Sequence, residues 1–166
     1  MRARLLISLA TCLPALVAAG NAQAGLNNHV AGKTAFDANC AVCHQAGAVG
    51  MEGLAPPLTD FPAIFSAHKA GRKHLISTVL YGMDGPITVG GHHYNFKMPN
   101  FSRLSNRELV SILNYLVFDV DHANTNLVQA YTPTAIAAVR KIVLTSDQNH
   151  HIRGLLTKKY TLTLTH

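Results

Sequence analysis

Apolar and polar residues follow a helical period in several separate segments of this 166-residue chain. The clearest segment is 105–118, in which apolar side chains recur at intervals of three and four positions. Ser105 and Glu108 open it with the S-x-x-E spacing of a capping box, in which the two residues satisfy backbone N–H groups of the first turn. A helix is therefore expected over 105–118, with one apolar face turned towards a core.

Two earlier segments also have helical spacing. In residues 70–82, AGRKHLISTVLYG, the apolar side chains fall on one face, and Gly82 is typical of the position that follows a helix end. Residues 30–41, VAGKTAFDANCA, predict a short helix that places Phe36 and Cys40 on the same face.

Two other segments lack a helical period. Residues 45–60, QAGAVGMEGLAPPLTD, are rich in Gly and Pro, which predicts a loop, but one too apolar to remain in water. Short runs of strand-forming residues flank Gly90-Gly91, which favours a small hairpin of Ile87–Val89 and His93–Phe96.

The C-terminal part of the chain predicts further helices. A polar linker over 119–131 leads to Thr132-Pro133, an N-cap followed by proline at the first helical position, and this helix is expected to reach about residue 144. Ser146 is expected to cap a shorter helix that ends near residue 156. The final stretch, TKKYTLTLTH, alternates apolar and polar residues, so a frayed tail and an edge strand both remain open.

The first 24 residues have the three parts of an export signal. Arg2 and Arg4 supply a basic start, residues 5–19 an apolar stretch, and residues 22–24 an A-x-A cleavage site. The mature chain is expected to begin at Gly25 and to be exported to the periplasm as a soluble protein. The alternatives are a buried N-terminal helix and a lipid anchor on Cys12, although the residue before that cysteine fits a lipoprotein site poorly.

The charge balance is moderately basic. The chain has 14 Lys and Arg against 8 Asp and Glu, a net charge of +6, which falls to +4 when Arg2 and Arg4 leave with the signal. In residues 130–166 the only acidic side chain is Asp147. A basic surface of this kind steers an acidic partner or is simply solvated, and nucleic acid is not an expected partner of an exported protein. After the first twenty residues no apolar run is long enough to span a bilayer.

Signal cleavage would leave two cysteines, both in the stretch CAVCH at 40–44. A disulfide is one alternative in an oxidising compartment, but a thioredoxin-like redox site needs a βαβ pattern, and a zinc site needs a second ligand pair. His44 directly after Cys43 completes C-x-x-C-H, the attachment signature of c-type haem. Thiols one helical turn apart reach the two vinyl groups of one porphyrin, and the next residue lies under the iron. The sequence therefore predicts a covalent haem at Cys40 and Cys43, with His44 as an iron ligand.

A second axial ligand is expected from a loop before the strongest helix. Met98 lies in NFKMPNF, where Phe96, Pro99 and Phe101 could hold its thioether over one haem face. His92 and His93 are the rival ligands and would give a bis-His iron. Their Gly-rich surroundings favour an exposed turn instead.

These features resemble the small soluble class I cytochromes c over about residues 30–118. Matching features in chain order are Gly32 and Phe36 before Cys40, the CAVCH motif, Pro56-Pro57-Leu58, Met98-Pro99 with Phe101, and a helix over 109–116 that includes Tyr115. The resemblance implies an all-α cytochrome c fold of short helices around one covalently bound haem, with a small β-hairpin and extra C-terminal helices added. It also implies that the Pro56 carbonyl accepts the N–H of His44. Ala55 departs from the family, which has glycine before that proline.

The resemblance implies a one-electron carrier rather than an enzyme. Its haem iron would be bound by His44 and Met98, and the porphyrin would be buried by Phe36, Leu54, Leu58, Phe96 and Phe101. The alternatives are a haem enzyme or ligand-binding sensor with an open or bis-His iron, and a non-haem metal module that uses His92-His93 or His150-His151.

The partners implied are other redox proteins. Residues 84–101 resemble bacterial cytochromes that accept electrons from periplasmic dehydrogenases, among them quinoprotein alcohol dehydrogenases and sulfite dehydrogenases, with an oxidase or another cytochrome as acceptor. Basic side chains near the haem edge could steer an acidic partner; the candidates are Lys69, Arg72, Lys73 and Lys97. The expected organisation is a signal over 1–24, a cytochrome c domain over 25–120 and a helical extension over 121–166.

Overall fold

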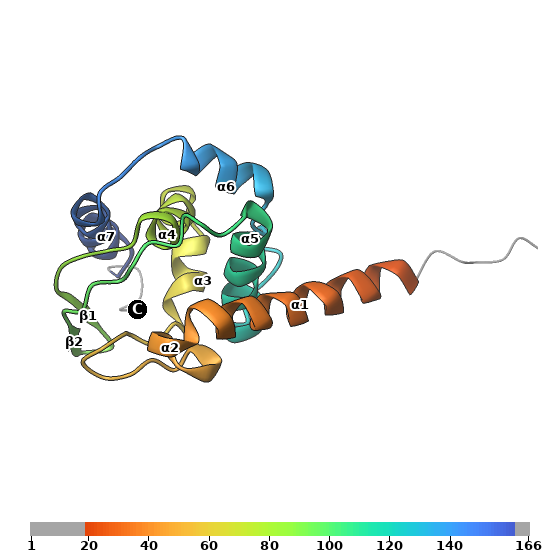
Figure 1. Cartoon of the computed structure of the whole chain (residues 1–166), viewed down its shortest axis with the longest axis horizontal. Helices are drawn as coiled ribbons and strands as arrows, with labels where there is room; N and C mark the ends of the chain where they lie inside the picture. The colour runs from red at the N-terminus through yellow and green to blue at the C-terminus, as the bar shows by residue number, and fades with distance from the viewer. Residues whose placement is uncertain (1–18, 162–166) are drawn as a thin grey trace, which may run out of the picture.

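The computed structural model describes residues 19–161, which form a mostly helical body with one two-stranded hairpin (Figure 1). The elements are α1 (Ala19–Asn39), α2 (Ala41–His44), η1 (Ala46–Ala48), α3 (Phe61–Ser66), α4 (Lys69–Tyr81), β1 (Ile87–Val89), β2 (His92–Tyr94), α5 (Asn106–Asn114), η2 (Tyr115–Val120), α6 (Pro133–Arg140) and α7 (Ser146–Thr161). Across residues 19–161, no helix combines the length and apolarity that a bilayer span requires.

Most of the expected export signal lies outside the described residues. The expected cleavage point after Ala24 falls inside α1, whose N-terminal part projects away from the body (Figure 1). Export therefore stays a prediction.

The core is centred on the crossing of α1 and α5. Gly32 lies against α5, where a Cβ on it would be 2.5 Å from the carbonyl oxygen of Ser111 and 2.6 Å from the Cβ of Tyr115. The rings of Phe36 and Tyr115 fill the adjacent space, with 5.6 Å between their centroids. The small residue and the aromatic pair thus allow two helices to pack at close range.

The predicted cap of α5 is confirmed. Ser105 Oγ accepts from the N–H of Glu108 at 3.3 Å, and Glu108 Oε2 accepts from the N–H of Ser105 at 2.8 Å. The α-helix gives way after Asn114 to the π-helical turns of η2, so the periodic segment is helical throughout its expected length.

Gly82 ends α4 as predicted and leads into the hairpin. Its φ of 72° is in the left-handed region that glycine adopts without strain. The hairpin turns at Gly90-Gly91 and pairs Val89 with His92, so β2 begins one residue earlier than expected.

Both C-terminal helices differ from their predicted limits. Thr132 caps α6 by accepting from the N–H of Ala135 at 3.2 Å, but the helix ends at Arg140. The cap of α7 is Thr145 rather than Ser146, because Thr145 Oγ1 accepts from the N–H of Gln148 and Gln148 Oε1 accepts from the N–H of Thr145. This capping box lies one residue before the predicted cap.

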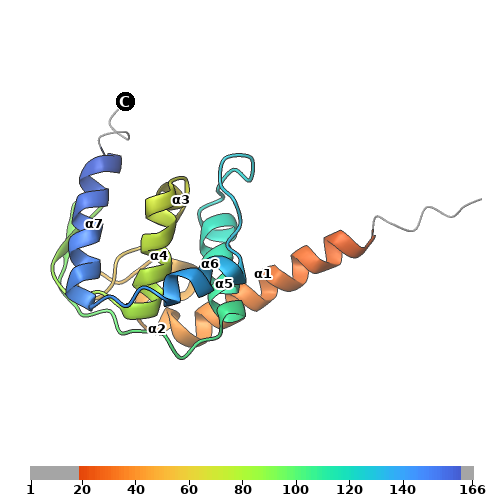
Figure 2. The same ribbon diagram turned by 90° about the horizontal axis from the view of Figure 1, so that it is seen from above.

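The alternation at the C-terminus does not produce a tail or a strand within the described residues. Residues 157–161 continue α7, because Leu156 and Tyr160 are one helical turn apart and pack on Phe65 of α3 in a second apolar cluster. The last five residues lie outside the described part of the chain. Figure 2 shows α7 running along the same side of the molecule as α3 and α4.

Candidate functional site

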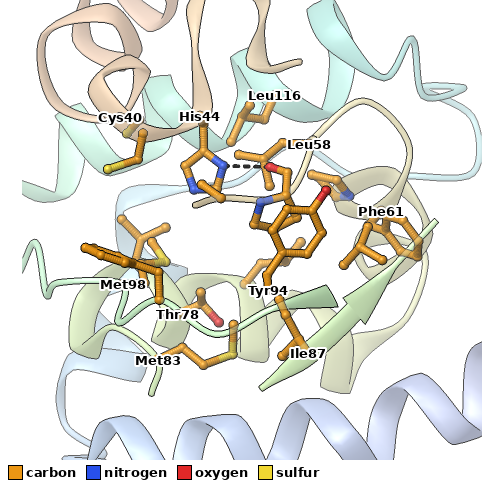
Figure 3. Close-up of a pocket in the computed structure, with 18 of the residues that line it drawn as sticks. Cys40, His44, Leu58, Phe61, Thr78, Met83, Ile87, Tyr94, Met98 and Leu116 are labelled. Atoms are coloured by element: carbon orange, nitrogen blue, oxygen red, sulfur yellow. Dashed lines mark hydrogen bonds between the residues drawn. The ribbon is translucent and has the colours of Figure 1, made fainter. Parts of the chain in front are cut away.

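A deep apolar cleft lies among α2, the loop after it, α3, α4 and the segment that follows α4 (Figure 3). About 1300 Å³ of space lies within it when its open mouth is included. All eight site residues expected from the sequence line this cleft, namely Cys40, Cys43, His44, Pro56, Leu58, Phe96, Met98 and Phe101.

The two cysteines of the described chain lie on the wall formed by α2, and both are free thiols. Continuous helical hydrogen bonding delivers them, with Cys40 N–H donating to the Phe36 carbonyl at 2.7 Å and His44 N–H to the Cys40 carbonyl at 2.9 Å. Burial raises the pKa of the Cys40 thiol to about 11. Both thiols therefore face a cleft of low polarity, at the spacing of one helical turn.

His44 projects into the cleft with a fixed orientation (Figure 3). Its Nδ1–H donates to the Pro56 carbonyl at 2.9 Å, as the sequence led us to expect. Because this hydrogen bond fixes the tautomer, the other ring nitrogen, Nε2, has a lone pair for a metal. Burial lowers the pKa of His44, which favours the neutral, metal-binding form.

The Pro56 segment is held against α2 by backbone hydrogen bonds. Gly50 N–H donates to the His44 carbonyl at 2.8 Å, and Leu58 N–H donates to the Ala48 carbonyl at 2.8 Å. The apolar loop predicted over 45–60 thus folds back on itself and forms part of the cleft wall. The alanine in place of the family glycine is accommodated, because Ala55 is buried in a backbone bridge to Met51.

Met98 lies on the wall of the cleft opposite His44, and Met83 lies near it (Figure 3). The two methionines form a reciprocal backbone bridge, with Met98 N–H to the Met83 carbonyl at 2.9 Å and Met83 N–H to the Met98 carbonyl at 3.2 Å. Phe101 N–H donates to the Val79 carbonyl at 2.9 Å and ties the loop to α4. Backbone contacts thus place a thioether across from the imidazole, in a loop without helical constraint.

Four of the five apolar residues expected to bury a porphyrin line the cleft. Phe36 does not line the cleft, because its ring packs against Tyr115 where α1 and α5 cross. Phe96 lines the cleft yet is 62% exposed, so it lies at the mouth, whereas Phe101 is buried.

The alternative metal-binding histidines lie elsewhere. His92 and His93 are exposed on β2, where His92 lies 3.1 Å from Glu52 and His93 lies 3.0 Å from Thr88. His150 hydrogen-bonds to the Pro86 carbonyl at 2.7 Å. Within residues 19–161, no three His, Cys, Asp or Glu side chains gather as a metal site would require.

Two of the basic side chains expected at the haem edge have specific partners. Arg72 donates to the carbonyls of Gln129 and Ala130 and stacks on Tyr131, so it binds the linker after η2. Lys97 lines the cleft and pairs with Asp84 at 2.8 Å.

The cleft also contains polar residues that sequence reasoning missed. His74 of α4 and Arg153 of α7 line it, although neither belongs to a motif. His74 sits in an ordinary amphipathic helix, and only the packing of α7 on α4 brings Arg153 to the cleft, so no local signal marks either residue.

These residues fit a porphyrin bound through thioethers. An apolar slot, two thiols on one wall, a neutral imidazole and a thioether on the opposite wall define the class of haem proteins with a covalently attached cofactor. The family model for cytochrome c matches residues 29–117 of the chain. The chain therefore belongs to the cytochrome c family, whose members are electron carriers rather than enzymes, and its cofactor is a covalently attached haem c with its iron.

Curated relatives agree with this assignment. Cytochrome c-552 of Thermus thermophilus is 34% identical over 105 residues, which cover 63% of this chain and 79% of the relative. A second cytochrome c-552, from a particular strain of the same organism, is also 34% identical over 105 residues, covering 70% of that relative. As an electron carrier of this family, the protein works with other redox proteins.

Proposed function

We propose that Cys40 and Cys43 form the two thioether bonds to the haem, and that His44 and Met98 are its axial ligands. The observation that carries this proposal is the placement of a tautomer-fixed imidazole and a loop thioether on opposite walls of one apolar cleft that both thiols also line. His92 and His93 are poor alternatives because neither lines that cleft.

The haem iron supplies the one-electron redox change, and the chain sets its conditions. Two neutral donors, the imidazole and the thioether, leave the ferric charge uncompensated and so favour the reduced state. The apolar lining of the cleft also favours the reduced state, because side chains such as Leu58 and Phe101 exclude water. A fairly high reduction potential is expected.

We place the exit for electrons at the mouth of the cleft near the thioethers. Val42, between the two cysteines, is 79% exposed, and Phe96 at the mouth is 62% exposed. An apolar rim of this kind suits brief contact with a second redox protein, because little polar surface has to be desolvated.

The partner is proposed to be a periplasmic dehydrogenase as donor, with an oxidase or another cytochrome as acceptor. Support comes from the export signal in the first 24 residues and from the resemblance of 84–101 to cytochromes of that kind. Location in the periplasm belongs to the same proposal.

Absorption spectra of the purified mature protein test the haem site. Sharp α and β bands after reduction, with a weak near-infrared sulfur-to-iron band in the oxidised form, are expected for His/Met ligation. A haem spectrum without that band would overturn the assignment of Met98. Cys40→Ala combined with Cys43→Ala should abolish covalent attachment, and normal covalent haem in this double variant would refute the attachment site.

A further inference from the structure

The C-terminal helix brings a cation to the cleft. Arg153 of α7 lines the cleft, although α7 lies beyond the residues that match the family. The centre of its guanidinium is 5.7 Å from the centroid of the Phe65 ring. A charged group in an apolar cleft costs free energy unless an opposite charge accompanies it.

Among the described residues, no such charge accompanies Arg153. None of the ion pairs among residues 29–160 includes Arg153. Burial lowers the pKa of Arg153, and no nearby acidic group opposes that effect. A guanidinium suits bidentate binding of a carboxylate, and no carboxylate of residues 29–160 forms an ion pair with Arg153.

His74 of α4 packs on the same aromatic ring as Arg153, with its Nδ1 turned into the protein interior. Its Nδ1 is buried without a hydrogen-bond partner among the described residues, while Nε2 lies 3.4 Å from Thr78 Oγ1. Its ring centroid is 5.6 Å from that of Phe65, the ring on which Arg153 also lies. Burial, helped by the charge of Arg153, lowers the pKa of His74 to about 4, so the imidazole is neutral at neutral pH.

These two residues belong to the side of the cleft away from the cysteines. Phe65 lies one turn after Phe61 in α3, and Figure 3 shows Phe61 across the cleft from Cys40. A haem carries its two propionates on the pyrrole rings opposite those that carry the vinyl groups. Attachment at the cysteines would therefore direct the propionates towards the side formed by α3 and α7.

We propose that Arg153 is the binding site for a haem propionate. The Arg153 guanidinium pairs with the carboxylate. This inference rests on the proposed haem site. It makes the extension over 121–166 part of the cofactor site.

The packing of α7 on α4 holds Arg153 in place. One turn before it, Asn149 is 0% exposed, accepts from Ser77 Oγ at 2.8 Å and donates to the Gly82 carbonyl at 2.8 Å. Within one turn after Arg153, Leu156 packs on Phe65. The guanidinium is thus positioned by a buried polar contact on one side and an apolar contact on the other.

Carbon-13 NMR of the haem propionates tests the proposal in the full-length holoprotein. Cells supplied with 5-aminolevulinate labelled at its carboxyl carbon place the label in the two propionate carboxyl groups, which are then titrated in the reduced protein. In Arg153→Met the pKa of one propionate should rise by about one unit or more relative to wild type, the loss of a tenfold preference for the ionised form.

Arg107→Met is the matched control, because Arg107 is exposed on α5, does not line the cleft and carries the same charge. Its propionate titrations should follow wild type. If Arg153→Met does not fold, Arg153→Lys and Arg153→Gln decide the question: the lysine variant should keep the low pKa and the glutamine variant should not. Identical titration curves with and without a cation at 153 would overturn the propionate site. Wild-type protein without covalent haem would overturn the haem site as well.

Discussion

Gly32 lies so close to Tyr115 that a single added carbon would be 2.6 Å from the Cβ of that tyrosine. The same carbon would be 2.5 Å from the backbone carbonyl oxygen of Ser111, which cannot move without shifting α5. Gly32→Ala should therefore lower the free energy of unfolding by about 1–3 kcal/mol, as overpacking does. Denaturant unfolding of the holoprotein, followed by far-ultraviolet circular dichroism, measures this.

Gly154→Ala is the control for this substitution. Gly154 is also helical, but a Cβ there would meet nothing within 4 Å. Alanine should stabilise α7 by up to about 1 kcal/mol. Equal effects of the two substitutions would contradict a close α1–α5 contact.

The two methionines of the cleft can be told apart by substitution. Met98→Ala should leave the haem attached, remove the near-infrared band and allow exogenous imidazole to bind at least about tenfold more tightly, a difference of about 1.4 kcal/mol. Met83→Ala, in the same backbone bridge, should keep the band and bind imidazole like wild type. The reverse pattern would make Met83 the ligand.

Asp121 should make stability depend on pH. Its Oδ2 accepts from the N–H of Ala63 at 2.7 Å, while Oδ1 is buried without a partner among the described residues. Burial raises the pKa of Asp121 from 3.8 to about 7, although the hydrogen bond from Ala63 opposes this. The folded state therefore holds a proton that the unfolded state has lost, so this group stabilises the fold fully below pH 4 and progressively less as pH rises through 7.

Asp121→Asn removes this titration and keeps an oxygen that can accept from Ala63. Between pH 4 and pH 8 the Tm of wild type should fall relative to the Tm of Asp121→Asn. Parallel curves of Tm against pH would show that the carboxyl does not retain its proton on folding.

The docking of α7 on α4 depends on Asn149. Asn149→Ala leaves the Gly82 carbonyl without its buried donor, at a cost of roughly 1–3 kcal/mol, whereas the Ser77 hydroxyl keeps its hydrogen bond to the His74 carbonyl at 2.9 Å. Thermal unfolding should show a lower Tm, and a protease should cut the segment between α6 and α7 faster. His151→Ala, at an exposed position on the same helix, should change neither.

Local chemistry was visible in the sequence, whereas contacts made by tertiary packing were not. The capping box at Ser105, the helix end at Gly82 and the CAVCH motif each depend on neighbours within a few residues, so their spacing predicted them. The cap of α7 was missed by one residue because Thr145 and Ser146 are both good caps, and only Gln148 selects between them.

The cleft shows the same division. The eight expected site residues line it, because each belongs to a motif or to a loop beside one. Phe36 was assigned to the cleft but packs on Tyr115, since its helical face also meets α5. Arg153 carried no signal, because its place follows from how α7 lies on α4.

The cleft walls come from distant parts of the chain, and this has a consequence for biogenesis. The cysteines and His44 lie early in the sequence, whereas Arg153 comes more than a hundred residues later. A chain that emerges from its N-terminus therefore presents its thiols while one side of the cleft is still missing. At the proposed attachment site, this gap would give attachment enzymes access to both cysteines, and docking of α7 on α4 would then close that side of the cleft.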